Sequence, residues 1–149
     1  MRAGNVDNRL QVLLVEDEPA DANLVRLAFE EGHVLVDLHH VGDGVDAFEF
    51  LRREGRHEDA PAPDLILLDL NMPRMDGREF LRKIKLEDAF KAIPVVVMTT
   101  SEAETDMVAS YCGGAAGFIV KPMDVADFIN KVKGLGNYWI AVVRLPENN

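Results

Sequence analysis

The chain has 149 residues, enough for one domain with a sizeable core, and its formal net charge is −10 at pH 7. This acidic excess argues against a nucleic-acid-binding surface, which needs clustered lysine and arginine. The single cysteine, Cys112, excludes an internal disulfide and suits a reducing compartment. The polar N-terminus lacks the apolar core of a signal peptide, and no apolar run could span a bilayer, so we expect a soluble cytoplasmic protein.

Apolar runs of strand length alternate with segments of helical spacing along most of the chain. Strands are expected over residues 11–15, 34–41, 65–68, 93–98 and 118–120. Helices are expected over residues 19–31, 43–53, 76–87 and 102–112, with a last one that begins near residue 124. In the second helix, the side that faces the core is expected to carry Val45, Ala47, Phe48 and Leu51. Residues 55–63 are polar with two prolines, which is typical of a surface loop. Strands that alternate with helices join by right-handed crossovers, so the pattern predicts an α/β fold with five parallel strands and five helices.

The central expected strand is the most informative part of the chain. Leu65 to Leu68 is wholly apolar, as in a strand buried on both faces of a parallel sheet. The run ends in Asp69, and Pro73 then marks a turn. Ligands bind at the carboxyl ends of the strands in open α/β sheets. Asp69 is therefore a candidate site residue, although an aspartate can also simply cap the next helix.

Polar side chains follow other expected strands as well. Glu16 and Asp17 come after the first strand, Thr99 after the fourth and Lys121 after the fifth. The carboxyl ends of parallel strands meet at one edge of a sheet, so we expect these residues to gather around Asp69. A polar residue at any one of these positions can be explained simply by the chain leaving the core there. For all of them together, that explanation is the weaker one.

Three neighbouring carboxylates repel one another, and this repulsion raises the pKa of at least one of them unless a cation is bound. Mg²⁺ prefers oxygen ligands and often binds through carboxylates together with a phosphate. One Mg²⁺ and one lysine balance the charge of Glu16, Asp17 and Asp69. A carboxylate held in this way can attack a phosphoryl group and form an aspartyl phosphate. Lys121 and the Thr99 hydroxyl would then stabilise charge on the transferred oxygens.

The chain resembles the receiver domains of two-component response regulators over about residues 10–133. The matching motifs are Val15-Glu16-Asp17-Glu18, Asp64-Leu65-Ile66-Leu67-Leu68-Asp69-Leu70-Asn71-Met72-Pro73, Met75-Asp76-Gly77, Met98-Thr99-Thr100 and Val120-Lys121-Pro122. The resemblance implies a flavodoxin-like, doubly wound sheet with strand order 2-1-3-4-5. It implies that Asp69 accepts phosphate from a histidine kinase, with Mg²⁺ bound by Glu16 or Asp17, by Asp69 and by the backbone carbonyl of Asn71. Such a protein is not an enzyme in the usual sense, because it catalyses only its own phosphorylation and dephosphorylation.

Two positions depart from the commonest receiver pattern. Many receivers have two aspartates where this chain has Glu16 and Asp17, and the longer glutamate can hold the metal through a water molecule. The aromatic switch residue is often tyrosine, whereas here it is Phe118. Phenylalanine forms no hydrogen bond, so we expect it to switch by packing alone. The alternative is that Phe118 is an ordinary hydrophobic residue of an edge strand.

Two other functions compete with this interpretation. A phosphohydrolase of the haloacid dehalogenase type also uses an aspartate, a lysine and paired acids with Mg²⁺. Its second acid would be Asn71 here, which cannot act as a general acid. Its acidic pair also comes last in the chain rather than before Asp69, and no cap domain is present. The other alternative is a receiver-like adaptor that is never phosphorylated, and the intact residue set argues against it.

Three parts are expected along the chain: an N-terminal tail over 1–9, the receiver over 10–133, and a helical extension with a tail over 134–149. No output domain follows residue 133, so we expect a stand-alone receiver. The tail over 137–146 and the long loop over 52–63 resemble the small receivers that partner bacterial phytochrome kinases, which makes such a kinase the expected partner.

The last expected helix, over residues 124–143, is longer than the strands that it covers. An apolar overhang of this kind usually marks an interface, and we expect a homodimer in which the same face meets itself. The expected interface residues are Phe128, Tyr138, Trp139, Ile140, Val142 and Val143. Gly134 and Gly136 disfavour a helix, so the alternative is that the helix breaks there and the tail folds back over its own core.

Overall fold

The computed structural model describes residues 9–70, 72, 74–75, 77–99, 114–120 and 124–144, with the backbone alone at 99, 120 and 139–144. Five parallel strands form one sheet in the order β2-β1-β3-β4-β5. The strands are β1 Leu10–Val15, β2 Val36–Val41, β3 Leu65–Asp69, β4 Val95–Thr99 and β5 Gly117–Val120. This order confirms the flavodoxin-like, doubly wound α/β fold.

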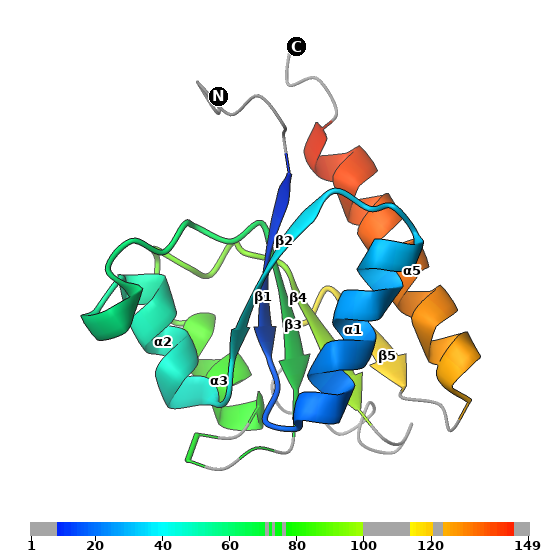
Figure 1. Ribbon diagram of the computed structural model, residues 1–149. Coiled ribbons are helices and arrows are strands. Elements are labelled where there is room, and N and C mark those ends of the chain that lie inside the picture. The colour runs from blue at the N-terminus through cyan, green and yellow to red at the C-terminus, as the bar shows by residue number, and fades with distance from the viewer. Residues whose placement is uncertain are drawn as a thin grey trace.

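Helices cover both faces of the sheet (Figure 1). They are α1 Pro19–Glu31, α2 Gly44–Arg52, α3 Gly77–Ile84 and α5 Val125–Arg144, with a short 3₁₀ helix η1 Gly55–His57. Helices α1 and α5 lie on one face, and α2 and α3 lie on the other. The helix expected over 102–112 falls outside the described residues.

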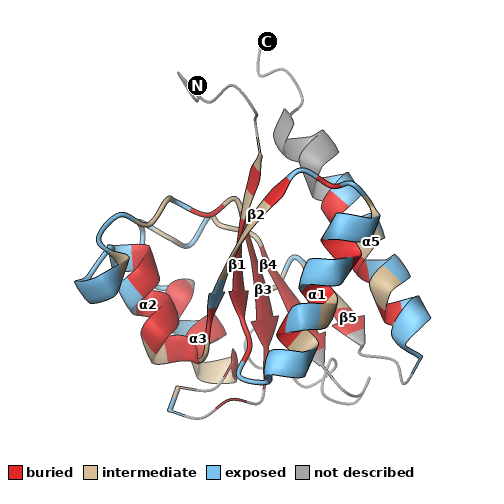
Figure 2. Ribbon diagram, viewed as in Figure 1, coloured by how far each residue is buried: buried red, intermediate tan, exposed pale blue. Residues whose placement is uncertain are grey.

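Each side of the sheet has its own hydrophobic core. The core under α2 and α3 includes Leu13, Ile66, Leu68 and Phe80. The core under α1 and α5 includes Val12, Leu14, Val25 and Phe29. All five residues of β3 are buried, as predicted for a strand covered on both faces (Figure 2). The alternation of side chains along β1 and β3 therefore supplies both cores at once.

Helix boundaries follow local chemistry where the sequence supplies it. Helix α1 begins at Pro19, after Glu18 accepts a hydrogen bond from the Ala20 N–H, and it matches the expected span. Helix α2 is capped by Asp43 and ends at Arg52, and the C-cap residue Arg53 adopts a left-handed conformation with φ of 58°. These boundaries depend on side-chain caps and turns within a few residues, so the sequence predicts them well.

Several expectations need correction, and one is that β2 begins at Val36 rather than at residue 34. Helix α3 ends at Ile84, and turns follow where the helix was expected to continue to residue 87. Strand β4 begins only after Pro94, because proline has no N–H to donate to the sheet. On α2, Val45 is only partly buried whereas Phe50 is buried, because the Phe50 ring packs against the rings of His39 and His57.

Helix α5 is a single helix of 20 residues that passes through Gly134 and Gly136. The alternative in which the helix breaks at these glycines is therefore wrong. In Figure 1 its C-terminal end extends beyond the start of β1. Within the part of the chain that the structure describes, no helix is long and apolar enough to cross a membrane.

Candidate functional site

Three carboxylates gather where β1 and β3 end. Glu16 and Asp17 follow β1, Asp69 ends β3, and each offers an oxygen within 4.8 Å of the other two. Glu16 is only 1% exposed and Asp69 is 5% exposed, whereas Asp17 is exposed to solvent. The expectation from the sequence that these three residues converge is thus met by the geometry. The strand arrowheads in Figure 1 point to this edge of the sheet.

Backbone contacts fix the position of Glu16. Its N–H donates to the Val41 carbonyl at 3.0 Å, which extends the β1–β2 pairing by one residue. Its carbonyl accepts a hydrogen bond from Nε2 of His40 at 2.6 Å. The Glu16 carboxylate in turn accepts the Glu18 N–H at 3.2 Å. The first acidic side chain is therefore held by its own loop and by β2 before any ligand binds.

The loop after Asp69 closes on itself through Gly77. The Gly77 N–H donates to the Leu70 carbonyl at 2.9 Å. A Cβ atom at position 77 would clash with the Asp69 carbonyl oxygen, so only glycine fits this approach. Leu70 and Met72 are buried and fasten the start of the loop in the core. Asp69 therefore sits at the base of a tight, anchored loop.

This set of donors suits a hard divalent cation. Carboxylate oxygens are the ligands that Mg²⁺ and Mn²⁺ prefer, and three of them converge here. Two of the three are buried, so their mutual repulsion is screened poorly by water. A bound cation removes that repulsion, and the site fits such an ion on chemical grounds.

The other expected site residues are only partly described. The backbone of Thr99 ends β4 and pairs with Val120 of β5, so both strands reach the edge that carries Asp69. Phe118 lies on β5 beside Val97 and is partly buried against the core under α2 and α3. The Thr99 side chain, Asn71 and Lys121 fall outside the described residues.

The expected interface residues on α5 differ in exposure. Phe128 is 3% exposed and packs in the core under α1 and α5, so little of its surface is available to a second copy. Tyr138 is 60% exposed. The side chains of Trp139, Ile140, Val142 and Val143 lie outside the described part of the chain.

One contact near the site was missed by the sequence analysis. Arg74, in the loop after Asp69, forms an ion pair with Asp43 at the start of α2, with Nε 2.6 Å from Oδ2. Asp43 could be recognised as a helix cap from its position. No local pattern, however, joins it to an arginine 31 residues further along the chain.

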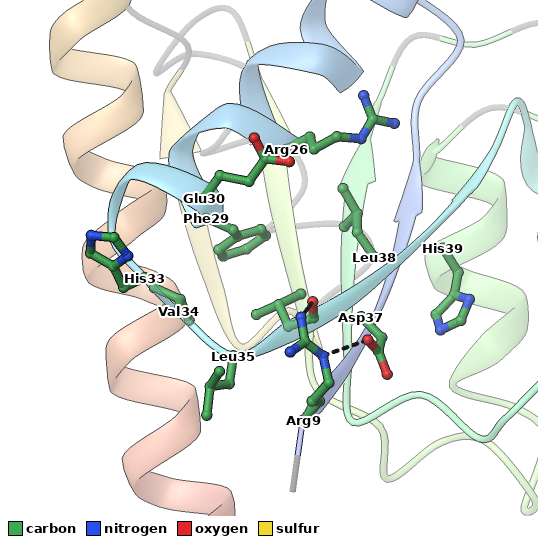
Figure 3. A pocket seen from close by; sticks show the side chains of 11 residues that line it. Arg9, Arg26, Phe29, Glu30, His33, Val34, Leu35, Asp37, Leu38 and His39 are labelled. Atoms are coloured by element: carbon green, nitrogen blue, oxygen red, sulfur yellow. Dashed lines mark hydrogen bonds and ion pairs between the residues drawn. The ribbon is translucent and has the colours of Figure 1, made fainter. Parts of the chain in front are cut away.

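A hollow of about 630 Å³ lies beside the start of β2, at the opposite end of the sheet from the carboxylates (Figure 3). Arg9 bridges to Asp37 there at 2.6 Å, and Gln11 donates to the other Asp37 oxygen at 2.8 Å. The hydrogen bond from Gln11 lowers the pKa of Asp37. Burial opposes this effect, but with the hydrogen bond from Arg9 the pKa of Asp37 stays below its usual value. The Asp37 carboxylate is thus already engaged by neighbouring side chains.

The two adjacent histidines of β2 have different partners. Nε2 of His39 lies 2.8 Å from the Gln11 side-chain oxygen, whereas His40 contacts the Glu16 carbonyl. Their side chains point to opposite faces of the sheet, as expected for neighbours on a strand. They do not form a joint metal site.

Comparison with known proteins adds independent information. The family model of the response regulator receiver domain matches residues 12–133. Response regulator Rcp1 from Synechocystis sp. is 42% identical over 135 residues, which cover 91% of this chain and 92% of Rcp1.

Solved structures give the same picture. The phosphorylated cyanobacterial phytochrome response regulator RcpA is 40% identical with a TM-score of 0.82, covering 93% of this chain and 99% of RcpA. The Mn²⁺-bound form of Rcp1 is 41% identical with a TM-score of 0.81, covering 92% of this chain and 99% of Rcp1. The bacteriophytochrome response regulator RtBRR is 31% identical with a TM-score of 0.78, covering 95% of this chain and 83% of RtBRR.

Proposed function

Because the chain belongs to the response regulator receiver domain family, we propose that Asp69 accepts a phosphoryl group from a histidine kinase in a reaction that requires Mg²⁺. The convergence of Glu16, Asp17 and Asp69 within 4.8 Å is the observation that carries this proposal. It brings the expected nucleophile and two expected metal ligands to one edge of the sheet.

The chemistry assigns a separate task to each residue. An Asp69 carboxylate oxygen attacks the phosphorus atom, the P–N bond of the kinase phosphohistidine breaks, and an acyl phosphate forms on Asp69. Glu16 or Asp17, Asp69 and the backbone carbonyl of Asn71 would hold the cation. When bound, Mg²⁺ offsets the negative charge of the carboxylates and of the phosphoryl oxygens. The Thr99 hydroxyl and the Lys121 ammonium would donate hydrogen bonds to those oxygens.

Signalling would follow from a shift between two conformations. If Thr99 moves toward the phosphoryl oxygens, Phe118 can pack into the space that it leaves. Phe118 is only partly buried, and it lies on β5, whose last residue pairs with Thr99. Phosphorylation would then favour one state in the way that any ligand with differential affinity does. The protein would thus catalyse only its own phosphorylation and dephosphorylation.

The proposed kinase is a bacterial phytochrome. Support comes from the relatives, since RcpA is described as a phytochrome response regulator and RtBRR as a bacteriophytochrome response regulator. Both match most of the chain, including part or all of α5 beyond residue 133, where the receiver model ends. The match of the receiver family model over residues 12–133 favours this function over the phosphohydrolase alternative.

We further propose that α5 contributes to a homodimer. The helix continues to Arg144, and Tyr138 in its second half is 60% exposed. An exposed aromatic side chain on a helix that extends beyond its sheet is well suited to contact a second copy of the chain. Phe128, which is buried in the core of its own chain, is left out of the proposed surface.

The function is tested by phosphorylating the full chain with acetyl phosphate or a phosphorylated kinase in the presence of Mg²⁺. We expect an acid-stable, base-labile acyl phosphate that disappears in Asp69→Asn and when EDTA removes the metal. Asp64→Asn is a matched control, because Asp64 lies at the other end of β3, where it accepts the Gln11 N–H at 2.8 Å. Label that survives in Asp69→Asn, or that appears on a histidine, would contradict the proposal.

A further inference from the structure

The loop that follows Asp69 has a closed base and an outer turn. Its base is closed by the Gly77–Leu70 hydrogen bond described above. The outer turn carries Arg74 and Met75, and it lies against the first residues of α2. The Gly44 N–H donates to the Met75 carbonyl at 3.1 Å. Helix α2 is therefore a support for the outer turn of the loop.

The ion pair between Arg74 and Asp43 makes this support specific. Nε of Arg74 donates to Oδ2 of Asp43 at 2.6 Å, and Nη2 donates to Oδ1 at 3.1 Å. Two parallel hydrogen bonds fix the orientation of the guanidinium plane as well as its distance. The Asp43 side chain is 10% exposed, so the acceptor is rigid although the Arg74 side chain is 58% exposed. Such geometry sets the pair apart from ordinary surface ion pairs.

Asp43 is itself held by α2. Its Oδ1 accepts the Asp46 N–H at 2.9 Å and thereby caps the helix. Burial raises the pKa of the Asp43 carboxyl, but the hydrogen bonds from Arg74 and from the Asp46 and Val45 amides outweigh burial and keep that pKa below its usual value. The carboxyl is therefore ionised at neutral pH and attracts Arg74 with a full charge.

Arg74 adopts a backbone conformation that arginine rarely takes. Its φ is 56°, in the left-handed region that favours glycine and asparagine. A residue keeps such a conformation only where its surroundings hold it. The two hydrogen bonds to Asp43 and the neighbouring Gly44–Met75 bond provide that hold.

We propose that the Asp43–Arg74 ion pair is a positioning contact that fixes the loop after Asp69 in the form that binds the cation. This inference rests on the proposed function and deepens it, because the loop carries Asn71, whose carbonyl is an expected metal ligand. Neither Asp43 nor Arg74 contacts the metal or the phosphoryl group in this role. They act through the loop backbone.

A simple effect of charge makes the opposite prediction for one of the two residues. Removing the positive charge of Arg74 would strengthen cation binding through space, and removing the negative charge of Asp43 would weaken it. Loss of a positioning contact weakens binding in both cases. The sign of the change in Arg74 variants therefore separates the two explanations.

The test is Mn²⁺ binding to the full chain, followed by the electron paramagnetic resonance signal of the free ion. The variants are Arg74→Ala, Asp43→Asn and the double variant. Asparagine keeps the side-chain oxygen that caps α2, so Asp43→Asn changes the ion pair more than the helix. Each single variant should weaken Mn²⁺ binding roughly 3- to 10-fold. This effect is smaller than the loss of affinity that follows when a residue hydrogen-bonded directly to a metal ligand is removed. The double variant should bind Mn²⁺ no more weakly than the single variant with the lower Mn²⁺ affinity, because both single substitutions remove the same contact.

Two further variants guard against trivial explanations. Arg74→Gly relieves the left-handed backbone, so it loses the ion pair without adding strain and should weaken binding as Arg74→Ala does. Arg56→Ala removes another arginine that contacts α2. Arg56 lies in η1, and its Nη2 is 2.5 Å from Oδ2 of Asp46. This variant should leave Mn²⁺ affinity unchanged. Stronger binding in the Arg74 variants, unchanged affinity, additive losses in the double variant, or an equal loss in Arg56→Ala would each overturn the proposal.

The outcome is distinct from that of the phosphorylation test. If the wild-type chain binds Mn²⁺ with the expected coupling but Asp69 is never phosphorylated, the proposed function fails and the positioning contact stands. If Asp69 is phosphorylated but the coupling is absent, the positioning contact fails and the function stands.

Discussion

His39 illustrates how one side chain makes stability depend on pH. It lies half-buried on β2, and this burial lowers its pKa below the ordinary 6.5, although the nearby Asp37 carboxylate partly opposes the shift. Its ring contacts the Gln11 side-chain oxygen at 2.8 Å. Folding therefore favours the neutral ring, because the charged form would lose water that these contacts do not replace.

We expect the folded protein to lose stability as the pH falls through the titration of His39. The unfolded chain, with a histidine pKa near 6.5, takes up a proton before the folded chain does. The contribution of His39 is thus fully present above that value and is lost as the pH falls toward the lower pKa of the folded state. His39→Gln should flatten the dependence of the free energy of unfolding on pH between about 7.5 and 5.5, as measured by urea unfolding.

The control for this prediction is His33→Asn. His33 is a turn residue with φ of 53°, and asparagine tolerates that conformation. A steeper or unchanged slope in His39→Gln, or an equal flattening in His33→Asn, would contradict the assignment to His39.

At the scale of elements, α5 shows why a helix can pass through two glycines. A Cβ atom at position 136 would lie 2.6 Å from the ring of Phe29 on α1, whereas at position 134 it would meet nothing within 4 Å. Glycine at 136 thus allows α5 and α1 to approach closely, and the packing offsets the low helix propensity.

The two glycines should respond in opposite ways to the same substitution. Gly134→Ala should raise the free energy of unfolding by up to about 1 kcal/mol, since alanine favours helix and finds open space. Gly136→Ala should lower it by about 1–3 kcal/mol, because the new methyl group forces α5 away from Phe29. Urea unfolding of both variants measures this, and each serves as the control for the other. Stabilisation by Gly136→Ala would contradict the close packing of α5 against Phe29.

Helix α2 connects two loops that are distant in sequence. Asp43 holds Arg74, and Asp46, one turn further on, accepts hydrogen bonds from Arg56 and His57 of η1. Most of the polar segment over 55–63 is exposed or partly buried, as expected for a surface loop, although Pro63 is buried. Arg56 and His57 fasten the start of this segment to α2. The same two aspartates stabilise the start of the helix.

At the scale of the whole molecule, α5 exceeds the sheet in length. Its 20 residues make a helix of about 30 Å, whereas strands of four to six residues measure about 13–20 Å. Tyr138 lies beyond the middle of the helix and is 60% exposed. The proposed dimer would cover this part of α5.

We expect the wild-type chain to sediment as a dimer at micromolar concentration. Deleting residues 137–149 removes the proposed surface and should yield a monomer that is still phosphorylated on Asp69 in the presence of Mg²⁺. Deleting only residues 145–149 keeps the whole helix, which ends at Arg144, and should preserve the dimer. A wild-type monomer in both the phosphorylated and the unphosphorylated form would end this proposal.

The framework of the fold and the acidic centre of the site could be predicted from the sequence. The apolar run before Asp69 identified the central strand, and the helical spacing over residues 19–31 predicted α1. Parallel strands bring their carboxyl ends to one edge, so the order of elements along the chain was enough to place Glu16 and Asp17 beside Asp69. These features depend on local periodicity, local caps and the order of elements along the chain, all of which can be read from the sequence.

The contacts that join distant segments could not be predicted in this way and became visible in the folded chain. The pairing of Arg74 with Asp43 depends on a left-handed turn in one loop and a cap on another element. The continuity of α5 depends on what lies opposite Gly136, and the burial of Phe128 depends on how α5 packs over the sheet. Such outcomes are set by the distances between elements after they pack, and no local pattern of residues encodes those distances.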